Sequence, residues 1–266
     1  MLYFVATPIG NLKDITFRAE QTLKSVDAIA CEDTRKSLVL LNSLGIKKPL
    51  FSYHKFNEKE SGEKIIERLK NGENIAVISD AGTPVISDPG NVLIKMLIDS
   101  GLEFTVIPGA CAFISALLLS GLDASKFAFL GFLPEKSGER KEFLNKYKNL
   151  DLTLIFYSAP HDVVKDVNSI YEVMGERVAV AVKEITKIHE RAVRFNLKDG
   201  LKEEPRGEYV ILVEGAANNA ALLELTEKEH VEKYLKEGMD KKDAIKLVAK
   251  ERGVPKSSLY KYTIGK

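Results

Sequence analysis

In the N-terminal part of the chain, short apolar runs alternate with longer amphipathic stretches. The apolar runs have the composition of buried β-strands, and they are Leu2–Ala6, Ala28–Cys31, Leu50–Ser52, Ile75–Ser79 and Phe104–Ile107. Between them, apolar residues recur at helical spacing, which predicts helices over Ile15–Ser25, Thr34–Leu44, Glu58–Lys70 and Asn91–Ser100. Apolar strands that alternate with helices are typical of a parallel sheet covered on both faces. The pattern therefore predicts an α/β domain with a parallel sheet over residues 1–111.

A second α/β domain is predicted over residues 112–219. It begins with a helix at Ala112–Ser120, and its strands are expected at Phe127–Gly131, Thr153–Tyr157, Val178–Val182 and Tyr209–Glu214. Two further helices are expected near Arg140–Tyr147 and Asp162–Met174. Apolar and polar residues alternate over Thr186–Asn196, as in an antiparallel strand, so this sheet is expected to be mixed.

The third predicted unit, residues 220–266, is small, helical and basic. Helices are expected at Glu227–Lys236, Lys241–Arg252 and Ser257–Tyr262, and the turn at Gly253 gives the last two a helix-turn-helix-like pattern. Met239–Lys266 holds eight Lys/Arg and three Asp/Glu, or +5, while the other residues sum to −4. A near-neutral body with a basic tail occurs in enzymes that act on nucleic acids, although a solvated lysine-rich helix pair gives the same count.

Composition excludes several classes of protein. The two cysteines, Cys31 and Cys111, lie outside any CxxC or Cys/His cluster, which excludes a disulfide scaffold and a zinc ribbon. No apolar run reaches the roughly 18 residues of a membrane helix. The N-terminus lacks the basic segment of a signal peptide, so a cytoplasmic protein is expected. The four histidines are scattered and no serine stands in a GxSxG setting, which argues against a hydrolase.

Three loops rich in small residues follow predicted strands, at the edge where open α/β sheets bind their ligands. They are Thr7–Asn11, Asp80–Pro84 with its neighbour Asp88–Gly90, and Pro108–Ala110. None matches GxGxxG or GxxxxGK[ST], which disfavours a dinucleotide or a triphosphate and favours a nucleoside-type cofactor without phosphate. A single loop of this composition would also be expected if it were only a tight turn between a strand and a helix, with no role in binding.

Charged residues follow two other predicted strands and are candidates for acid–base work. They are Glu32–Arg35 and Lys183–Lys187. The plain alternatives are that Asp33 or Thr34 caps the next helix and that the second group is a solvated strand end.

Eight strings occur in the order found in one known family: TPIGNLKDIT, CEDTR, ISDAGTPVISDPG, PGACAFISAL, FLGFLPEKSGER, LIFYSAPH, VKEITKIHE and RGEYVILVEG. From Leu2 to about Gly215 the sequence resembles the 16S ribosomal RNA cytidine 2′-O-methyltransferases. These are a branch of the tetrapyrrole-methylase-like S-adenosylmethionine (SAM) methyltransferases. The chain departs from the family at Ala110-Cys111-Ala112, where a proline and a serine are expected, and at Tyr157, where a glutamate is expected.

The resemblance implies two α/β domains with SAM in the cleft between them, and a homodimer without metal. It implies SAM contacts from Pro8, Asp80, Ala81, Gly82, Thr83, Ala112, Gly131 and Phe132. Because a ribose hydroxyl is a weak acid, a base or an alkoxide-stabilising cation would help, and the catalytic candidates are Lys183, Glu184, Asp33 and Arg35. Contacts with 16S rRNA are expected from Lys136, Arg140, Lys141, Lys241, Lys242 and Lys256.

Two other functions remain open at this point. A methyltransferase acting on a tetrapyrrole-type small molecule would share the SAM cleft and would not need the basic tail. A non-catalytic RNA-binding protein would use the tail and would have no need for three ordered glycine loops.

Overall fold

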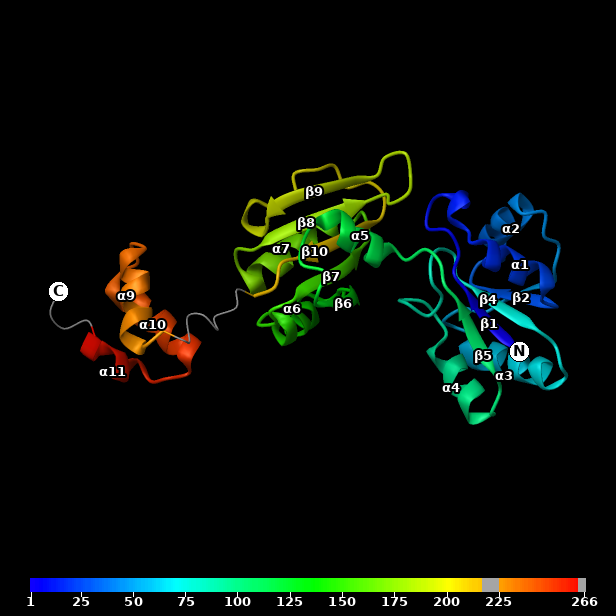
Figure 1. The fold of residues 1–266 in the computed structure, drawn as a ribbon, viewed down its shortest axis with the longest axis horizontal. Helices are drawn as coiled ribbons and strands as arrows, with labels where there is room; N and C mark the ends of the chain where they lie inside the picture. Colours follow the sequence, from blue (N-terminus) through cyan, green and yellow to red (C-terminus); the bar gives the residue numbers. More distant parts are fainter. Residues whose placement is uncertain (217–224, 263–266) are drawn as a thin grey trace. The chain divides into compact units, whose positions relative to one another are not determined.

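The computed structural model describes residues 1–216 and 225–262 of the 266-residue chain. The chain divides into a first unit, Met1–Glu214, and a second unit, Gly215–Lys266. The first unit contains two five-stranded sheets that follow one another along the sequence (Figure 1). Among the described residues, no helix is long and apolar enough to cross a membrane.

The N-terminal sheet is parallel throughout, as the sequence predicts. Its order is β3-β2-β4-β1-β5, and its strands are β1 (Leu2–Val5), β2 (Ala28–Cys31), β3 (Leu50–Ser52), β4 (Ile75–Ile78) and β5 (Phe104–Ile107). The intervening helices are η1 (Leu12–Asp14), α1 (Phe17–Ser25), α2 (Thr34–Ser43), α3 (Glu58–Lys70) and α4 (Asn91–Asp99). Because all five strands run the same way, the loops that follow them lie at one edge of the sheet.

Helices cover both faces of this sheet. Because successive side chains of a strand point to opposite sides, each strand contributes side chains to both faces. Phe4 and Val77 pack in one cluster with residues of α3 and α4, among them Ile65 and Leu93. Val5 belongs to the cluster on the other face, with residues of α1 and α2 such as Leu23 and Leu41. Strands buried on both faces explain the continuous apolar runs in the sequence.

The second sheet is mixed, also as predicted, with the order β6-β7-β10-β8-β9. Its strands are β6 (Phe127–Phe132), β7 (Thr153–Ser158), β8 (Val178–Lys183), β9 (Arg191–Asn196) and β10 (Tyr209–Val213). The β6–β7 pair is parallel and the other three pairs are antiparallel. Strand β9 is shorter than the predicted strand Thr186–Asn196, because Thr186–Glu190 belong to a loop. In this loop Thr186 has a φ of 68°, which no regular strand allows.

Helix α5 (Ala112–Ser120) packs on one face of the second sheet, where Ala116 and Leu117 meet Ile155 and Leu212. Helices α6 (Ser137–Tyr147) and α7 (Val163–Met174) cover the other face, and their contacts include Val167 with the cluster around Phe156. A domain boundary between residues 111 and 112 stays a prediction.

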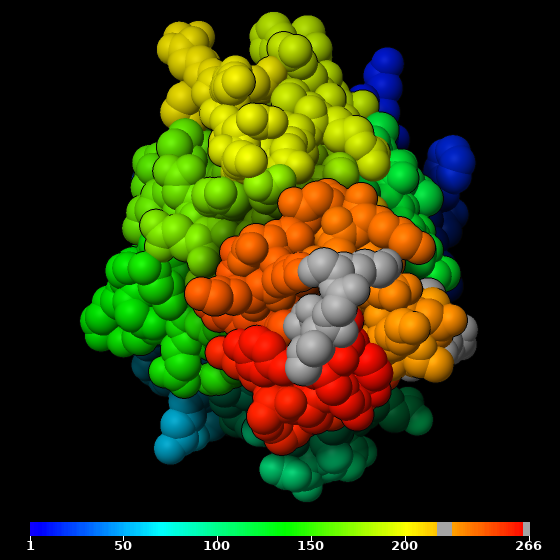
Figure 2. All heavy atoms as spheres, turned by 90° about the vertical axis from the view of Figure 1, so that its left-hand side faces the viewer, coloured from blue at the N-terminus to red at the C-terminus, as the bar shows by residue number. Residues whose placement is uncertain are grey.

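The second unit consists of α9 (Glu227–Lys236), α10 (Lys241–Arg252), α11 (Lys256–Leu259) and η3 (Tyr260–Tyr262). Thr226 and Glu229 form a capping box at the start of α9, and Gly253, with a φ of 65°, ends α10. The helices share a small core of Val231, Ile245, Val248, Ala249 and Leu259. Figure 2 shows the atoms of these helices, coloured orange to red, as one continuous cluster.

Candidate active site

A cavity of about 400 Å³ lies in the first unit, within the size range of small-molecule sites. One part of its wall comes from the loops after β1, β2, β4 and β5, including Ile9, Glu32, Asp80 and Cys111. The other part comes from residues at the ends of β6, β7, β8 and β10. The wall therefore joins segments that follow or end strands of both sheets.

Most of the predicted cofactor residues line this cavity. They are Asp80, Ala81, Gly82, Thr83, Ala112 and Phe132. Pro8 and Gly131 are not in the wall, although each is the immediate neighbour of a wall residue, Ile9 or Phe132.

Backbone contacts tie the three small-residue loops together. The N–H of Thr7 donates to the carbonyl of Gly82 at 2.8 Å, and the N–H of Gly82 donates back at 3.1 Å. The hydroxyl of Thr83 donates to the carbonyl of Ala110 at 3.2 Å. Gly82 has a φ of 81°, and a Cβ there would lie 3.2 Å from Cγ2 of Ile9, so both backbone shape and space favour glycine.

Backbone strain is concentrated in two loops of the cavity wall. In the described part of the chain, the non-glycine residues with positive φ are Val85 (75°), Ser87 (65°), Glu184 (51°) and Thr186 (68°). Such conformations cost on the order of 1–3 kcal/mol each, most for β-branched side chains, and they persist where the surrounding structure enforces them. Their clustering makes both loops candidates for a functional role.

Carboxylates dominate the charge of the cavity wall, and they differ in their partners. Asp80 accepts hydrogen bonds from Nζ of Lys36 at 2.7 Å and from the N–H of Asp33 at 3.1 Å. Glu184 accepts from Nζ of Lys187 at 3.0 Å and from the N–H of Glu208 at 3.2 Å. The carboxylates of Glu32 and Asp88 have no hydrogen bond or ion pair with any described residue.

The two unpartnered carboxylates bind protons more tightly than usual. Burial, followed by the charges of Glu32 and Asp80, raises the pKa of Asp88 to about 6. Burial, followed by the charge of Asp80, also raises the pKa of Glu32. A wall with this excess of negative charge favours a ligand that carries positive charge.

Of the four predicted catalytic residues, the structure brings only Glu184 to the cavity wall. Nζ of Lys183 is instead 2.6 Å from a carboxylate oxygen of Glu203. Asp33 caps α2 by accepting from the N–H of Arg35 at 2.9 Å. The hydrogen bonds from Arg35 lower the pKa of Asp33 to about 2, which makes this carboxylate a poor base at neutral pH.

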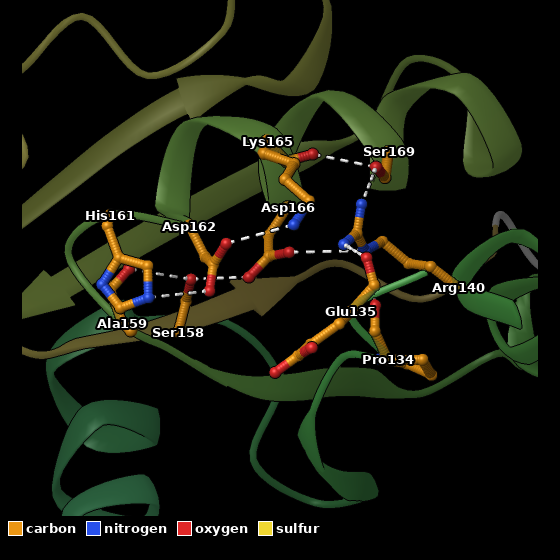
Figure 3. Close-up of polar contacts among 10 residues, drawn as sticks. All are labelled: Pro134, Glu135, Arg140, Ser158, Ala159, His161, Asp162, Lys165, Asp166 and Ser169. Atoms are coloured by element: carbon orange, nitrogen blue, oxygen red, sulfur yellow. Dashed lines mark hydrogen bonds and ion pairs between the residues drawn. The ribbon is translucent and has the colours of Figure 1, made fainter. Parts of the chain in front are cut away.

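Arg140 lies in the interior and not at the RNA-accessible surface that the sequence analysis expected. Its side chain is 3% exposed and its guanidinium donates to the carbonyls of Pro134 at 2.9 Å and Glu135 at 2.7 Å (Figure 3). Nε also lies 3.6 Å from Oδ1 of Asp166. The donors of Arg140 are already used inside the protein, so the prediction that Arg140 contacts RNA is wrong.

This buried cluster connects two stretches of the cavity wall. Asp166 accepts at Oδ2 from the hydroxyl of Ser158, at 2.7 Å, and Ser158 lines the cavity (Figure 3). Pro134 and Glu135 follow Phe132, which also lines it. We therefore infer that Arg140 and Asp166 hold these two stretches of the cavity wall in place.

The remaining predicted RNA contacts are accessible. Lys136 is exposed and pairs with Glu139 at 2.9 Å, and Lys141 pairs with Glu172 at 2.7 Å. Lys241, Lys242 and Lys256 are exposed on α10 and α11 of the second unit. Among the described residues, no group of three or more His, Cys, Asp or Glu could hold a metal ion.

Comparison with known proteins gives consistent matches. Residues 1–200 match the family model described as Tetrapyrrole (Corrin/Porphyrin) Methylases. A Bacillus subtilis (strain 168) protein named "Ribosomal RNA small subunit methyltransferase I" is 44% identical, over 98% of this chain and 92% of its own. The crystal structure of uroporphyrin-III-C-methyltransferase from Thermus thermophilus matches with a TM-score of 0.56 and 18% identity, over 85% of this chain and 96% of that chain. This last match supports the fold alone.

A shorter relative is informative about the second unit. The Thermotoga maritima protein of the same name is 40% identical over 218 residues, which are 80% of this chain and 98% of that protein. The first unit makes up 214 of the 266 residues, about the same share. That relative is therefore about as long as the first unit.

Proposed function

Because the chain belongs to the tetrapyrrole (corrin/porphyrin) methylase family, it is a methyltransferase, and we propose that it methylates the ribose 2′-oxygen of a cytidine in 16S rRNA with SAM as the methyl donor. The observation that carries the proposal is the 44% identity, over 98% of the chain, with a protein named as a small-subunit rRNA methyltransferase. The cytidine 2′-oxygen is proposed from the resemblance of the sequence motifs. A cytoplasmic location follows from such a substrate.

The cavity suits the proposed methyl donor. SAM supplies a methyl group on a positively charged sulfur, which makes the methyl group ready for transfer. The acidic wall complements that charge and the ammonium group of the same molecule. The residues proposed to hold SAM are Asp80–Thr83, Ala112 and Phe132, with Pro8 and Gly131 placing their neighbours.

The remaining task of the chain is to position the acceptor oxygen and to receive its proton. Alignment of two reactants in one site can supply about 7–11 kcal/mol of the lowering of the barrier. The interlocked loops around Thr7, Gly82 and Ala110 provide the rigidity that such alignment needs.

We propose that the second unit increases affinity for rRNA and is not needed for binding SAM. Its exposed Lys241, Lys242 and Lys256 supply positive charge for phosphate contacts, together with Lys136 and Lys141 of the first unit. The Thermotoga relative, about as long as the first unit, supports an auxiliary role.

Removal of the chain after Asn219 tests this role. The truncated protein should bind SAM as the full chain does, bind RNA more weakly, and show a shallower dependence of RNA affinity on salt. Each phosphate contact on a duplex contributes roughly 0.9 decades of affinity per decade of salt, and less on single strands. If the truncated protein had the same RNA affinity and the same salt dependence but no longer formed a dimer, the second unit would serve to stabilise the dimer.

A homodimer is part of the proposal. Apolar side chains of α5 face solvent in the single chain, including Leu118 at 74% exposure, Ile114 about one helical turn before it, and Leu119 directly after it. Light scattering should give about twice the 29.6 kDa of one chain, and a mass near one chain would rule the dimer out.

Methyl transfer itself is tested with labelled SAM. The purified full chain is incubated with small ribosomal subunits that lack the modification, with naked 16S rRNA, and with a porphyrinoid acceptor. Nuclease digestion followed by mass analysis should place the label on 2′-O-methylcytidine. Label on the porphyrinoid alone would favour a tetrapyrrole methylase, and binding of RNA without any labelling would favour a non-catalytic RNA-binding protein.

A further inference from the structure

Phe56 is an aromatic residue on the surface of the first unit, and nothing described so far uses its side chain. It is 95% exposed and lies in the turn between β3 and α3. We infer that the ring of Phe56 stacks on an unpaired base of the RNA substrate, close to the nucleotide that enters the cavity. This inference rests on the proposed function, because it assumes that the methyl acceptor is part of an RNA chain.

Hydrogen bonds hold the turn that carries Phe56 in one shape. The carbonyl of His54 accepts from the N–H of Asn57 at 2.9 Å, and the N–H of His54 donates to Oδ1 of Asn57 at 2.7 Å. Nδ2 of Asn57 also donates to the carbonyl of Ser52, the last residue of β3, at 3.2 Å. Asparagine side chains commonly close turns in this way. Because the backbone around Phe56 is already fixed, little of the protein must be ordered when a base binds.

The same turn is joined on two sides to segments of the cavity wall. The N–H of Tyr53 donates to the carbonyl of Cys31 at 2.8 Å, and the next residue, Glu32, lines the cavity. A carboxylate oxygen of Glu58 accepts from the hydroxyl of Tyr53 at 3.2 Å and from the N–H of Gly90 at 2.7 Å. Gly90 ends the loop after β4, which supplies another part of the wall. An RNA chain with one nucleotide in the cavity therefore passes close to this turn.

The surroundings of Phe56 suit a nucleic acid better than a protein partner. Between Val39 and Ile86, a stretch that the structure describes throughout, no other large apolar residue is exposed. The core of a protein interface is a patch of several apolar side chains, and none is available here. An unpaired base, in contrast, needs only one aromatic face on which to stack.

Two lysines next to Phe56 supply the charge that an RNA backbone requires. Lys55 and Lys59 are exposed, and neither forms an ion pair with a described residue. A cation beside an aromatic face is the usual combination in sites for single-stranded nucleic acids. In the inferred complex these two lysines contact the phosphates on either side of the stacked base.

The test measures single-turnover methyl transfer from labelled SAM over a range of concentrations of small ribosomal subunits that lack the modification. Phe56→Ala should raise the half-saturating concentration of subunits by about 5- to 150-fold, the value of one stacked base, and leave the rate at saturation nearly unchanged. Phe56→Trp and Phe56→Tyr should behave as the wild type does, because each keeps an aromatic face. Phe56→Leu keeps apolar surface without a ring and should lose most of the affinity. Ile98→Ala, at a 62% exposed apolar residue of α4, is the control and should change nothing.

A salt series separates stacking from charge. RNA affinity of Phe56→Ala should fall by the same factor at every salt concentration, because the ring carries no charge. The double variant Lys55→Ala, Lys59→Ala should instead show a shallower salt dependence, by roughly 0.7 decades of affinity per decade of salt for each phosphate contact on a single strand. An unchanged slope in the double variant would overturn the phosphate contacts.

Three further outcomes decide the inference. Urea denaturation and calorimetric titration of SAM should be the same for Phe56→Ala as for the wild type, so that neither folding nor the methyl donor accounts for the loss. An unchanged half-saturating concentration in Phe56→Ala, or wild-type behaviour of Phe56→Leu, would overturn the inference alone. Light scattering that showed a dimeric wild type and a monomeric Phe56→Ala would place the ring between two copies of the chain and overturn it as well. A wild-type chain that labels no ribose would overturn the proposed function together with this inference.

Discussion

Asp88 is half-buried and Asp166 is buried, and burial raises the pKa of each. Asp166 accepts a hydrogen bond from Ser158 at 2.7 Å and lies 3.6 Å from Nε of Arg140, so its charge is balanced within the protein. Asp88 has only the negative Glu32 and Asp80 as charged neighbours of note. The balanced carboxylate lies behind the wall of the cavity and holds it in place, while the unbalanced one lies in the wall itself. The two carboxylates therefore differ most clearly in their partners.

The largest expected effect is a loss of folding stability when the carboxylate of Asp166 is removed. Asp166→Ala should lower the free energy of unfolding by about 3–5 kcal/mol, because it leaves the guanidinium of Arg140 buried and uncompensated. Urea denaturation measures the loss. Asp162→Ala, at a more exposed carboxylate that pairs with Lys165, is the control and should cost under about 1 kcal/mol. A loss below about 1 kcal/mol for Asp166→Ala would mean that the pair does not brace the wall.

At Asp88 we expect the opposite change, a gain in the free energy of unfolding when the carboxylate is removed. Its folded-state pKa of about 6 lies above the unfolded value of 3.8, so the folded protein binds more protons and loses stability as pH rises between these values. Asp88→Asn should therefore be more stable than the wild type by about 1–2 kcal/mol at pH 8, a figure reduced for partial solvent access. The gain should shrink towards zero near pH 4. Urea denaturation at pH 4, 6 and 8 checks it, and a destabilised variant at pH 8 would contradict the comparison.

The smallest expected effect comes from the strained loop. Ser87→Gly should stabilise the fold by about 1 kcal/mol, because glycine adopts a positive φ without strain. Single-turnover methyl transfer from labelled SAM to small ribosomal subunits should nevertheless slow, since this loop of the cavity wall is then less firmly held. Ser100→Gly is the control, with a φ of −89° at the end of α4, and it should give no such gain. Ser87→Gly with unchanged stability and unchanged rate would show that the strain has no role.

Much of the fold is predictable from the sequence, because the period of the apolar residues decides it. The continuous runs Ile75–Ile78 and Tyr209–Val213 are buried strands, as expected. The alternation over Thr186–Asn196 holds only from Arg191 onward, since two loop residues before it have positive φ. Local pattern does not reveal such strain.

The site is less predictable, because it depends on contacts between distant residues. The chain order of the small-residue loops indicates the edge of the sheet, and six of the eight predicted cofactor residues line the cavity. Arg140 stands at the start of a polar helix and its sequence context is that of a surface residue. Its contacts with the carbonyls of Pro134 and Glu135 and with Asp166 show that it is an internal residue. Asp88 lies within the ISDAGTPVISDPG string, but the lack of a partner among the described residues is a property of the fold.

The location of the methyl donor is the central claim. Gly82 is a poor probe of it, because any side chain at its φ of 81° strains the backbone whatever the ligand does. Ala81 is exposed in the cavity wall, so Ala81→Trp fills the space with little effect on packing. Ala124→Trp, at an exposed position outside the wall, is its control.

Calorimetric titration of SAM into these variants is the most direct measurement. The wild type and Ala124→Trp should bind one SAM per chain with the same affinity, and Ala81→Trp should show no binding. Undiminished binding of SAM to a folded Ala81→Trp protein would place the methyl donor outside this cavity and contradict the account.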